Sequence, residues 1–178
     1  MTTPRTRLIA NLRAIVAIPL AGAGLLGLAT LPAQAETPVQ SPPAQSSALQ
    51  APDVAVKKTS GCGCCVAWME HMEENGFSVS GENVPNGALV RFKMRSGVPQ
   101  EMASCHTARV GGYVIEGHVP AADVRRLLDE RPDAVGLAVP GMPLGSPGMD
   151  FGDDQEAYEV HLIRRDGSTE VFSRHPGS

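Results

Sequence analysis

Three of the four cysteines in this 178-residue chain lie within the four residues Cys62-Gly63-Cys64-Cys65. Cys62 and Cys65 have the Cys-x-x-Cys spacing of thiol redox pairs, and Cys64 adds a third sulfur to the same turn. The glycines around Cys62 let the backbone bend tightly enough for the thiols to converge, and a helix that begins here would favour thiolate over thiol. The spacing indicates a soft-metal site or a thiol-redox site.

Four more candidate ligands lie downstream of this turn. Cys105, the last cysteine, is followed by His106, whose imidazole is the best nitrogen candidate. Met142 and Met149 lie in a loop rich in glycine and proline, where a methionine has little core to fill and its sulfur can bind a soft metal. The predicted metal ligands are Cys62, Cys64, Cys65, Cys105, His106, Met142 and Met149.

The other soft or titratable side chains have more ordinary interpretations. Met69 and Met72 recur at helical spacing and are predicted to fill the core. His118 lies at the entrance of a predicted helix, where it can orient the backbone as well as bind a metal. The remaining histidines are predicted surface residues, and they are His71, His161 and His175.

Crowding of the sulfurs decides which metal the site favours. Thiolate-rich sites suit Cu(I), zinc and iron–sulfur clusters. Zinc usually takes two well-separated pairs of ligands, whereas three of these four cysteines share one turn. Thiolates that bridge several Cu(I) ions relieve this geometry, so the pattern favours a polynuclear Cu(I) centre.

Two alternatives use the same cysteines without copper. A structural disulfide alone fits poorly, because a bond from Cys62 to Cys65 closes a very small loop and removes little chain entropy. Thiol–disulfide exchange on other proteins is the stronger alternative, with Cys65 or Cys62 as nucleophile and Cys64 or Cys105 as the resolving thiol. The sequence assigns no catalytic residue, and redox activity of copper or thiols stays open beside metal binding.

Other classes of function lack support in the sequence. No Ser-His-Asp order, phosphate-binding loop, paired-carboxylate motif or haem Cys-x-x-Cys-His motif is present. Removal of a predicted signal segment takes away three arginines and no acid, which leaves 12 basic residues against 19 acidic ones and a formal net charge of −7. An acidic secreted protein is a poor candidate for nucleic-acid binding.

The N-terminal third of the chain predicts export. Residues 1–35 combine three arginines, an apolar run and the small-x-small sequence Ala33-Gln34-Ala35, which is the order of a secretory signal. An uncleaved membrane anchor is the alternative, since the apolar run approaches spanning length. Residues 36–53, rich in Pro, Gln, Ser and Ala, predict a flexible linker, and residues 54–178 predict one small domain.

Periodicity and turn residues predict a mixed sheet with about two main helices, which is an α/β or α+β architecture. A strand, the cysteine turn and a helix follow one another in the order of a thioredoxin-like active site. Residues 89–94 are ambiguous between helix and strand. The other predicted elements are strands at 54–57 and 77–84, a short strand or extended segment at 135–139, helices at 65–75 and 121–130, and hairpins at 108–116 and 158–172.

Several short blocks in a fixed order resemble the CopG-type family of periplasmic copper-resistance proteins. The resemblance covers residues 56–172 and implies a thioredoxin-like fold, a role in copper tolerance, and copper held by the Cys-x-Cys-Cys turn and Cys105. We also expect copper ions and other periplasmic copper-handling proteins as partners, and no membrane association after signal cleavage. The matching blocks are Cys62-Gly63-Cys64-Cys65, Ser104-Cys105-His106-Thr107, Gly117-His118-Val119-Pro120, Glu130-Arg131-Pro132, Val139-Pro140-Gly141-Met142-Pro143 and Gly145-Ser146-Pro147-Gly148-Met149.

Overall fold

The computed structural model describes residues 52–178, so the predicted signal segment and nearly all of the predicted linker lie outside the described residues. Within residues 52–178, no helix is long and apolar enough to cross a bilayer. The elements in chain order are β1 (Asp53–Lys58), α1 (Gly63–Glu74), β2 (Ser78–Asn83), α2 (Asn86–Arg95), the 3-10 turn η1 (Gln100–Met102), β3 (Thr107–Val110), β4 (Tyr113–Glu116), α3 (Ala121–Glu130), β5 (Gly136–Ala138), β6 (Tyr158–Ile163) and β7 (Thr169–His175).

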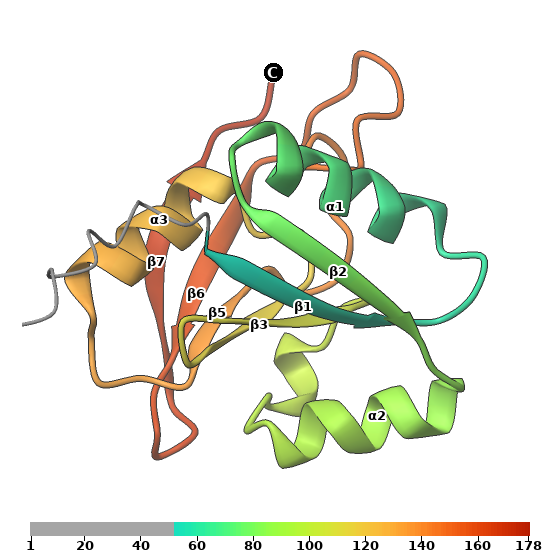
Figure 1. The fold of residues 1–178 in the computed structure, drawn as a ribbon. Helices are drawn as coiled ribbons and strands as arrows, with labels where there is room; N and C mark the ends of the chain where they lie inside the picture. Colours follow the sequence, from blue (N-terminus) through green and yellow to red (C-terminus); the bar gives the residue numbers. More distant parts are fainter. Residues whose placement is uncertain (1–51) are drawn as a thin grey trace, which may run out of the picture. The chain divides into compact units, whose positions relative to one another are not determined.

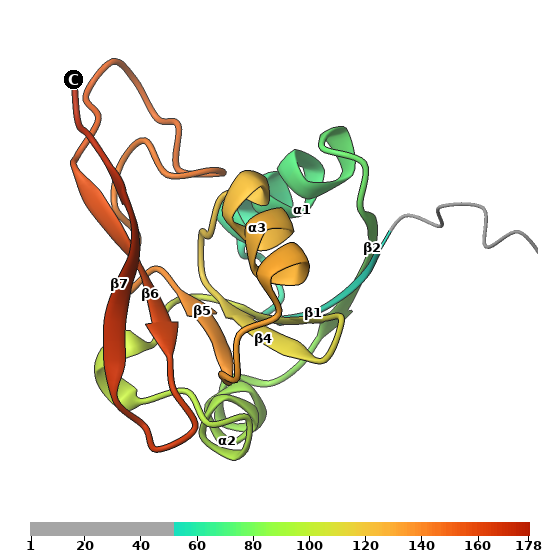
Figure 2. The same cartoon turned by 90° about the vertical axis from the view of Figure 1, so that its left-hand side faces the viewer.

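The seven strands of this region form one mixed sheet in the order β2-β1-β3-β4-β5-β6-β7. The pairs β1–β2 and β4–β5 are parallel, and the other neighbours are antiparallel. Helices α1 and α3 cover one face of the sheet, and α2 covers the other face (Figures 1 and 2). The predicted mixed α/β fold with a C-terminal hairpin is confirmed, and the order β1, cysteine turn, α1 is compatible with a thioredoxin-like arrangement.

The core follows the apolar periodicity of the sequence. In β1, Val54 and Val56 are buried on one face of the strand, as alternation requires. In α1, Trp68 and Met72 lie one turn apart and are fully buried, so Met72 fills the core as predicted. Burial of this helix face anchors the cysteine turn to the sheet.

The ambiguous segment 89–94 belongs to helix α2. Leu89 and Lys93, four residues apart, point from one face of α2 into the protein and are buried. Because one of the two buried positions is a lysine, the sequence does not show a continuous apolar stripe on this helix. The lysine can be buried because Glu116, on a distant strand, neutralises its charge. Tertiary pairing therefore decides the conformation of this segment.

All three histidines that were predicted at the surface, His71, His161 and His175, are half-buried, and two of them join separate elements. His71 on α1 is half-buried, and its Nε2 accepts a hydrogen bond of 3.1 Å from the backbone N–H of Ala121 at the start of α3. His175 lies in β7, with Nε2 2.8 Å from a carboxylate oxygen of Asp123 and its ring stacked on Tyr158. Both imidazoles tie separate elements together.

Candidate metal centre

The cysteine turn joins the end of β1 to the beginning of α1. Cys62 is the N-cap residue of α1 in extended conformation, and its carbonyl oxygen accepts a hydrogen bond from Val66. Cys65 is fully buried on the helix face that enters the core, while Cys62 and Cys64 are half-buried. The turn therefore presents two sulfurs toward solvent and one toward the core.

Two of these cysteines are covalently joined in this structure. Cys62 and Cys65 form a disulfide, with their Cα atoms 5.3 Å apart. Cys64 and Cys105 carry free thiols. The bond shows that the Cys-x-x-Cys pair is placed for thiol redox chemistry, which was the alternative interpretation of the same spacing.

Cys105 reaches the turn because β3 runs antiparallel to β1. Lys57 pairs with Thr107, so the residues just before Thr107 pass beside the turn that follows β1. The Cys105 sulfur lies 3.5 Å from that of Cys65 and 3.9 Å from that of Cys64. All four sulfurs lie within 4.8 Å of one another and form a group that can hold a metal ion.

Two imidazoles lie behind Cys105. His106 is fully buried, with Nδ1 3.4 Å from the Cys105 sulfur and its ring packed against Trp68 at 4.4 Å between centroids. His118, also fully buried, has Nε2 3.0 Å from the same sulfur. Cys105, His106 and His118 form a second group of potential ligands.

Inspection of separate motifs did not predict that His118 lies next to the Cys105 sulfur. The hairpin register pairs Thr107 with Glu116, so continuing outward by two residues on each side places Cys105 opposite His118. The Gly111-Gly112 turn already indicated this register. The signal was therefore present in the sequence, in the spacing of the two residues from the turn.

Burial governs the protonation of these groups. Loss of solvation, with a smaller contribution in the same direction from neighbouring Cys64, raises the pKa of the Cys105 thiol to about 12. Burial holds the pKa of His106 well below its ordinary value and also lowers that of His118, against the opposing effects of Pro147 and Asp150. At neutral pH the site contains a thiol and two neutral imidazoles, whose lone pairs are those that metals bind.

The Gly/Pro loop from 140 to 150 packs against the centre. A Cβ on Gly148 would meet the backbone N of Trp68 at 2.6 Å and the carbonyl oxygen of Cys64 at 2.7 Å, so the loop lies directly on the first turn of α1. Met149 next to it is half-buried, whereas Met142 is 51% exposed. The loop backbone reaches the centre, and the roles of both methionines as ligands stay predictions.

A buried ion pair holds the segment before Cys105. Lys93 on α2 donates to a carboxylate oxygen of Glu116 at 2.5 Å and to the hydroxyl of Thr107 at 2.9 Å. The same carboxylate accepts the backbone N–H of Ser104 at 2.7 Å. This network connects α2, β3 and β4 and fixes the backbone that carries Cys105.

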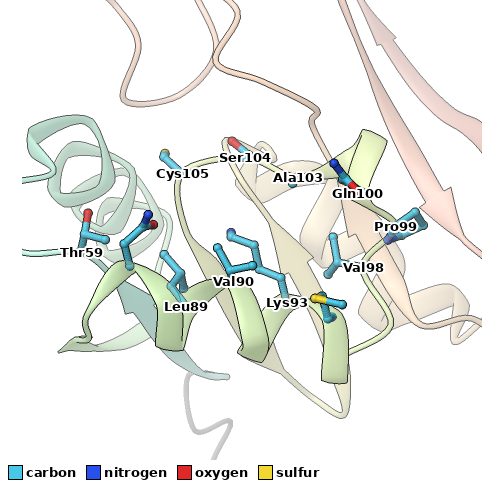
Figure 3. A pocket seen from close by; sticks show the side chains of 12 residues that line it. Thr59, Leu89, Val90, Lys93, Val98, Pro99, Gln100, Ala103, Ser104 and Cys105 are labelled. Atoms are coloured by element: carbon cyan, nitrogen blue, oxygen red, sulfur yellow. The ribbon is translucent and has the colours of Figure 1, made fainter.

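A groove of about 810 Å³ opens beside this network. Figure 3 shows Leu89, Val90 and Lys93 of α2 directed toward Ser104 and Cys105 on its other side. The groove gives solvent a path to the Cys105 side of the centre.

Comparison with known proteins agrees with this geometry. A family model described as "Protein of unknown function, DUF411" matches residues 102–149. Two solved structures, named "Copper resistance protein copG" Form 2 and Form 1, are each 47% identical to this chain, with TM-scores of 0.66 and 0.65. They cover 71% and 70% of this chain, which covers 99% and 98% of theirs. No curated protein matches the chain.

The fold and the site define a small mixed α/β protein whose four cysteines converge on one place that can hold a metal. The chain belongs to the CopG family of copper resistance proteins, as the identity and coverage of the solved relatives show. The resemblance drawn from the sequence blocks is confirmed.

Proposed function

We propose that this protein binds copper in the periplasm as part of copper resistance, and that it holds Cu(I) in a polynuclear, thiolate-bridged centre. The observation that carries the proposal is the convergence of all four cysteine sulfurs, from two distant segments, in a chain whose solved relatives are named copper resistance proteins. The centre would serve to sequester copper, transfer it to other periplasmic copper-handling proteins or change its oxidation state. His106, Met142 and Met149 complete the proposed ligands.

Stoichiometry distinguishes a cluster from a single ion. Sulfurs 3.5 to 3.9 Å apart can surround one ion, because metal–sulfur bonds of about 2.3 Å in a tetrahedron place sulfurs at similar separations. Cys64 and Cys65 are consecutive residues, however, and Cys65 is buried while Cys64 is half-buried. Binding of one ion by the thiolates of Cys62, Cys64 and Cys65 together would strain the turn. Thiolates that bridge two ions would avoid this strain.

Copper loading requires the reduced form of the centre. The Cys62–Cys65 disulfide leaves two free thiols, Cys64 and Cys105. A cellular dithiol that donates two electrons and two protons would open the bond and free all four sulfurs. Loss of those protons on metal binding then yields the thiolates that copper needs.

The test is a titration of protein reduced under anaerobic conditions with Cu(I) against a competing chelator. We expect saturation above one ion per chain and a preference for Cu(I) over zinc. Cys64→Ser should lower the number of ions bound, since it removes a bridging sulfur while Cys62 and Cys65 remain. Saturation at one ion, or stronger zinc binding, contradicts the cluster.

Thiol–disulfide exchange with other proteins is the second candidate function. The observation in its favour is the Cys62–Cys65 disulfide at the start of α1, with the Cys105 sulfur 3.5 Å from that of Cys65. Under this function Cys64→Ser keeps the redox pair, so reduction or oxidation of a test disulfide should change little. Unchanged copper stoichiometry in this variant would favour exchange over copper storage.

We further propose that residues 1–35 are a secretory signal, residues 36–53 a linker and residues 54–178 the metal-binding domain. The support is the order of basic, apolar and Ala-x-Ala segments in the sequence. Intact mass of protein recovered from the periplasm should correspond to a chain that begins at Glu36. Recovery of the full-length chain in the membrane fraction would instead indicate an anchor.

A further inference from the structure

We propose that a second copy of this chain inserts its residues 150–157 into the groove beside α2, so that molecules associate head to tail. The α2 groove, of about 810 Å³, is lined on one side by Leu89, Val90 and Met94 of α2. Residues 150–157, the acidic segment, follow the Gly/Pro loop on the other side of the domain. The contact needs no metal and does not depend on the proposed copper function.

The α2 groove has an apolar wall that the described chain leaves open. Val90 and Met94, one helical turn apart on α2, are 46% and 71% exposed. Val98 and Pro99 add apolar surface to the same groove, and Figure 3 shows Val90 and Val98 along it. Its volume lies within the range of about 300–1,000 Å³ that is usual for binding sites. Exposed apolar side chains that gather in one hollow mark a contact surface.

Positive charge borders this apolar wall. Helix α2 carries three basic residues and no acid, and one of the three, Lys93, is neutralised by Glu116. Arg91 precedes Met94 by three residues and therefore lies beside it on the helix surface, and Arg95 continues the row one turn further. Both arginines are exposed, and neither forms an ion pair within residues 52–178. The groove therefore suits an apolar side chain flanked by carboxylates.

The acidic segment has this complementary composition. Every residue from 150 to 157 is exposed, and the aromatic ring among them, Phe151, is 63% exposed. The segment contains no basic residue, and in the described part of the chain none of its carboxylates forms an ion pair. Its acidic residues are Asp150, Asp153, Asp154 and Glu156. An exposed ring between free carboxylates matches the apolar and basic surface of α2.

Hydrogen bonds hold the acidic segment in shape before any contact forms. The backbone N–H of Leu144 donates to the carboxylate of Glu156 at 3.0 Å, and the N–H of Glu156 donates to the carbonyl oxygen of Leu144 at 2.9 Å. This pair closes the base of the loop, and the N–H of Phe151 donates to the carbonyl oxygen of Met149 at 2.9 Å inside it. A loop that is ordered in advance loses less conformational entropy on binding than a free peptide.

The arrangement of the domain requires two chains for this contact. Figures 1 and 2 show the orange loop that carries the acidic segment at one end of the domain and α2 at the other end, with the sheet between them. One chain therefore cannot fill its own groove. Because the two surfaces differ, the contact is heterologous and builds open chains or rings rather than a twofold dimer. A single short loop buries little area, so the association should be weak.

Sedimentation velocity of the purified, metal-free protein tests the association. Between about 10 μM and about 1 mM we expect the average mass to rise above that of one chain, and to fall again when salt screens the charges. Phe151→Ser should raise the dissociation constant at least about tenfold, because it removes the buried ring. Met94→Glu should do the same, because its charge repels the acidic segment. Non-reducing electrophoresis checks that no disulfide joins the chains.

Val171→Glu is the matched control. This residue is an exposed apolar side chain on β7, outside both surfaces, so the variant should associate as the wild type does. Phe151 and Met94 are also exposed, so neither substitution disturbs the core, and circular dichroism verifies the fold of each variant.

A mixture of the two variants tests the head-to-tail geometry. Met94→Glu protein keeps an intact acidic segment, and Phe151→Ser protein keeps an intact groove. Each alone should remain a single chain, whereas an equal mixture should form a complex of one chain of each. Growth should stop at two chains, because the remaining groove and the remaining segment are both disabled.

Three results would overturn the proposal. They are a wild-type protein that stays monomeric at about 1 mM, a Phe151→Ser protein that associates as strongly as the wild type, and a mixture of the variants that stays monomeric. Association that Met94→Glu abolishes but Phe151→Ser leaves intact would mean that the groove binds another surface, such as the α2 groove of a second molecule. Copper titration of the monomeric variants tests the proposed function independently of all these results.

Discussion

Cys105 is the residue at which the two ligand groups meet. Its sulfur lies within 4 Å of ligand atoms of Cys64, Cys65, His106 and His118. Burial suppresses its ionisation, so the metal-free site stores a proton that an incoming ion must displace. The thiol therefore makes metal binding a proton-releasing reaction.

This proton release predicts a pH dependence of copper binding. Because the pKa of Cys105 is raised to about 12, the thiol is protonated throughout the neutral range, and each copper bound there releases one proton. The apparent Cu(I) affinity of reduced protein should then rise by about tenfold per pH unit from this thiol alone. Chelator competition at several pH values measures the slope, and Cys105→Ser should lower it by one unit. An equal slope in both proteins would show that Cys105 is not a ligand.

At the scale of elements, the centre depends on how a loop docks onto a helix. The 140–150 loop lies against the first turn of α1 at Gly148, and the Pro147 carbonyl in the same loop orients His118. The loop therefore supports both ligand groups at once. Gly148 has φ of +82°, and its hydrogen in place of a side chain permits the close approach to Cys64 and Trp68.

Gly148→Ala should weaken the fold and the metal centre together. Gly141 in the same loop has φ of +70° but nothing within 4 Å of its Cβ position, so Gly141→Ala is a matched control for the backbone strain alone. We expect a loss of about 1 kcal/mol for Gly141→Ala, and of about 2–4 kcal/mol for Gly148→Ala because the new methyl group overlaps backbone atoms. Urea denaturation measures both. Equal losses would mean that the loop does not pack on α1 as described.

At the scale of the whole molecule, the domain buries titratable groups from several elements. His106 and His118 are held neutral, whereas Lys93 and Glu116 form a charged pair, and burial raises the pKa of Glu116 against the opposing effect of Lys93. These groups connect the sheet to α2 and to the 140–150 loop. Stability should therefore respond to pH.

We expect the metal-free protein to lose stability as the pH falls below about 6.5. The lowered pKa values of His106 and His118 mean that the unfolded chain binds more protons there, so the free energy of unfolding falls by up to about 1.4 kcal/mol per pH unit for each histidine. Glu116 has a raised pKa, so its contribution to the free energy of unfolding changes with pH in the opposite direction, over a pH range that begins near 4.5. The contribution of one carboxyl group does not cancel those of two histidines. Urea denaturation from about pH 7 to pH 5 measures the slope, which His106→Gln should reduce. A flat profile would contradict neutral buried imidazoles.

The sequence by itself determined those helices and turns whose signals lie within a few consecutive residues. The Gly111-Gly112 hairpin, the helix that begins after Pro120 and the cysteine turn all follow from turn residues and apolar periodicity, which act over a few positions. The ordered blocks also identified the family, because several motifs in one order are specific even where each is weak alone. The convergence of Cys105 on the turn was inferred from its type and confirmed by the pairing of β3 with β1.

Only the tertiary structure decided the features that rest on distant partners. Lys93 is buried in a helix because Glu116, 23 residues away, neutralises it. The tautomer of His118 depends on a carbonyl oxygen 29 residues further along the chain, although its position opposite Cys105 follows from the local register of the hairpin. The environment of a side chain, unlike the propensity of a segment, is set by whatever the fold packs against it. The sequence alone therefore indicated a sulfur-rich centre with His106 beside it, while the folded chain showed that the His118 imidazole is buried next to the same sulfur.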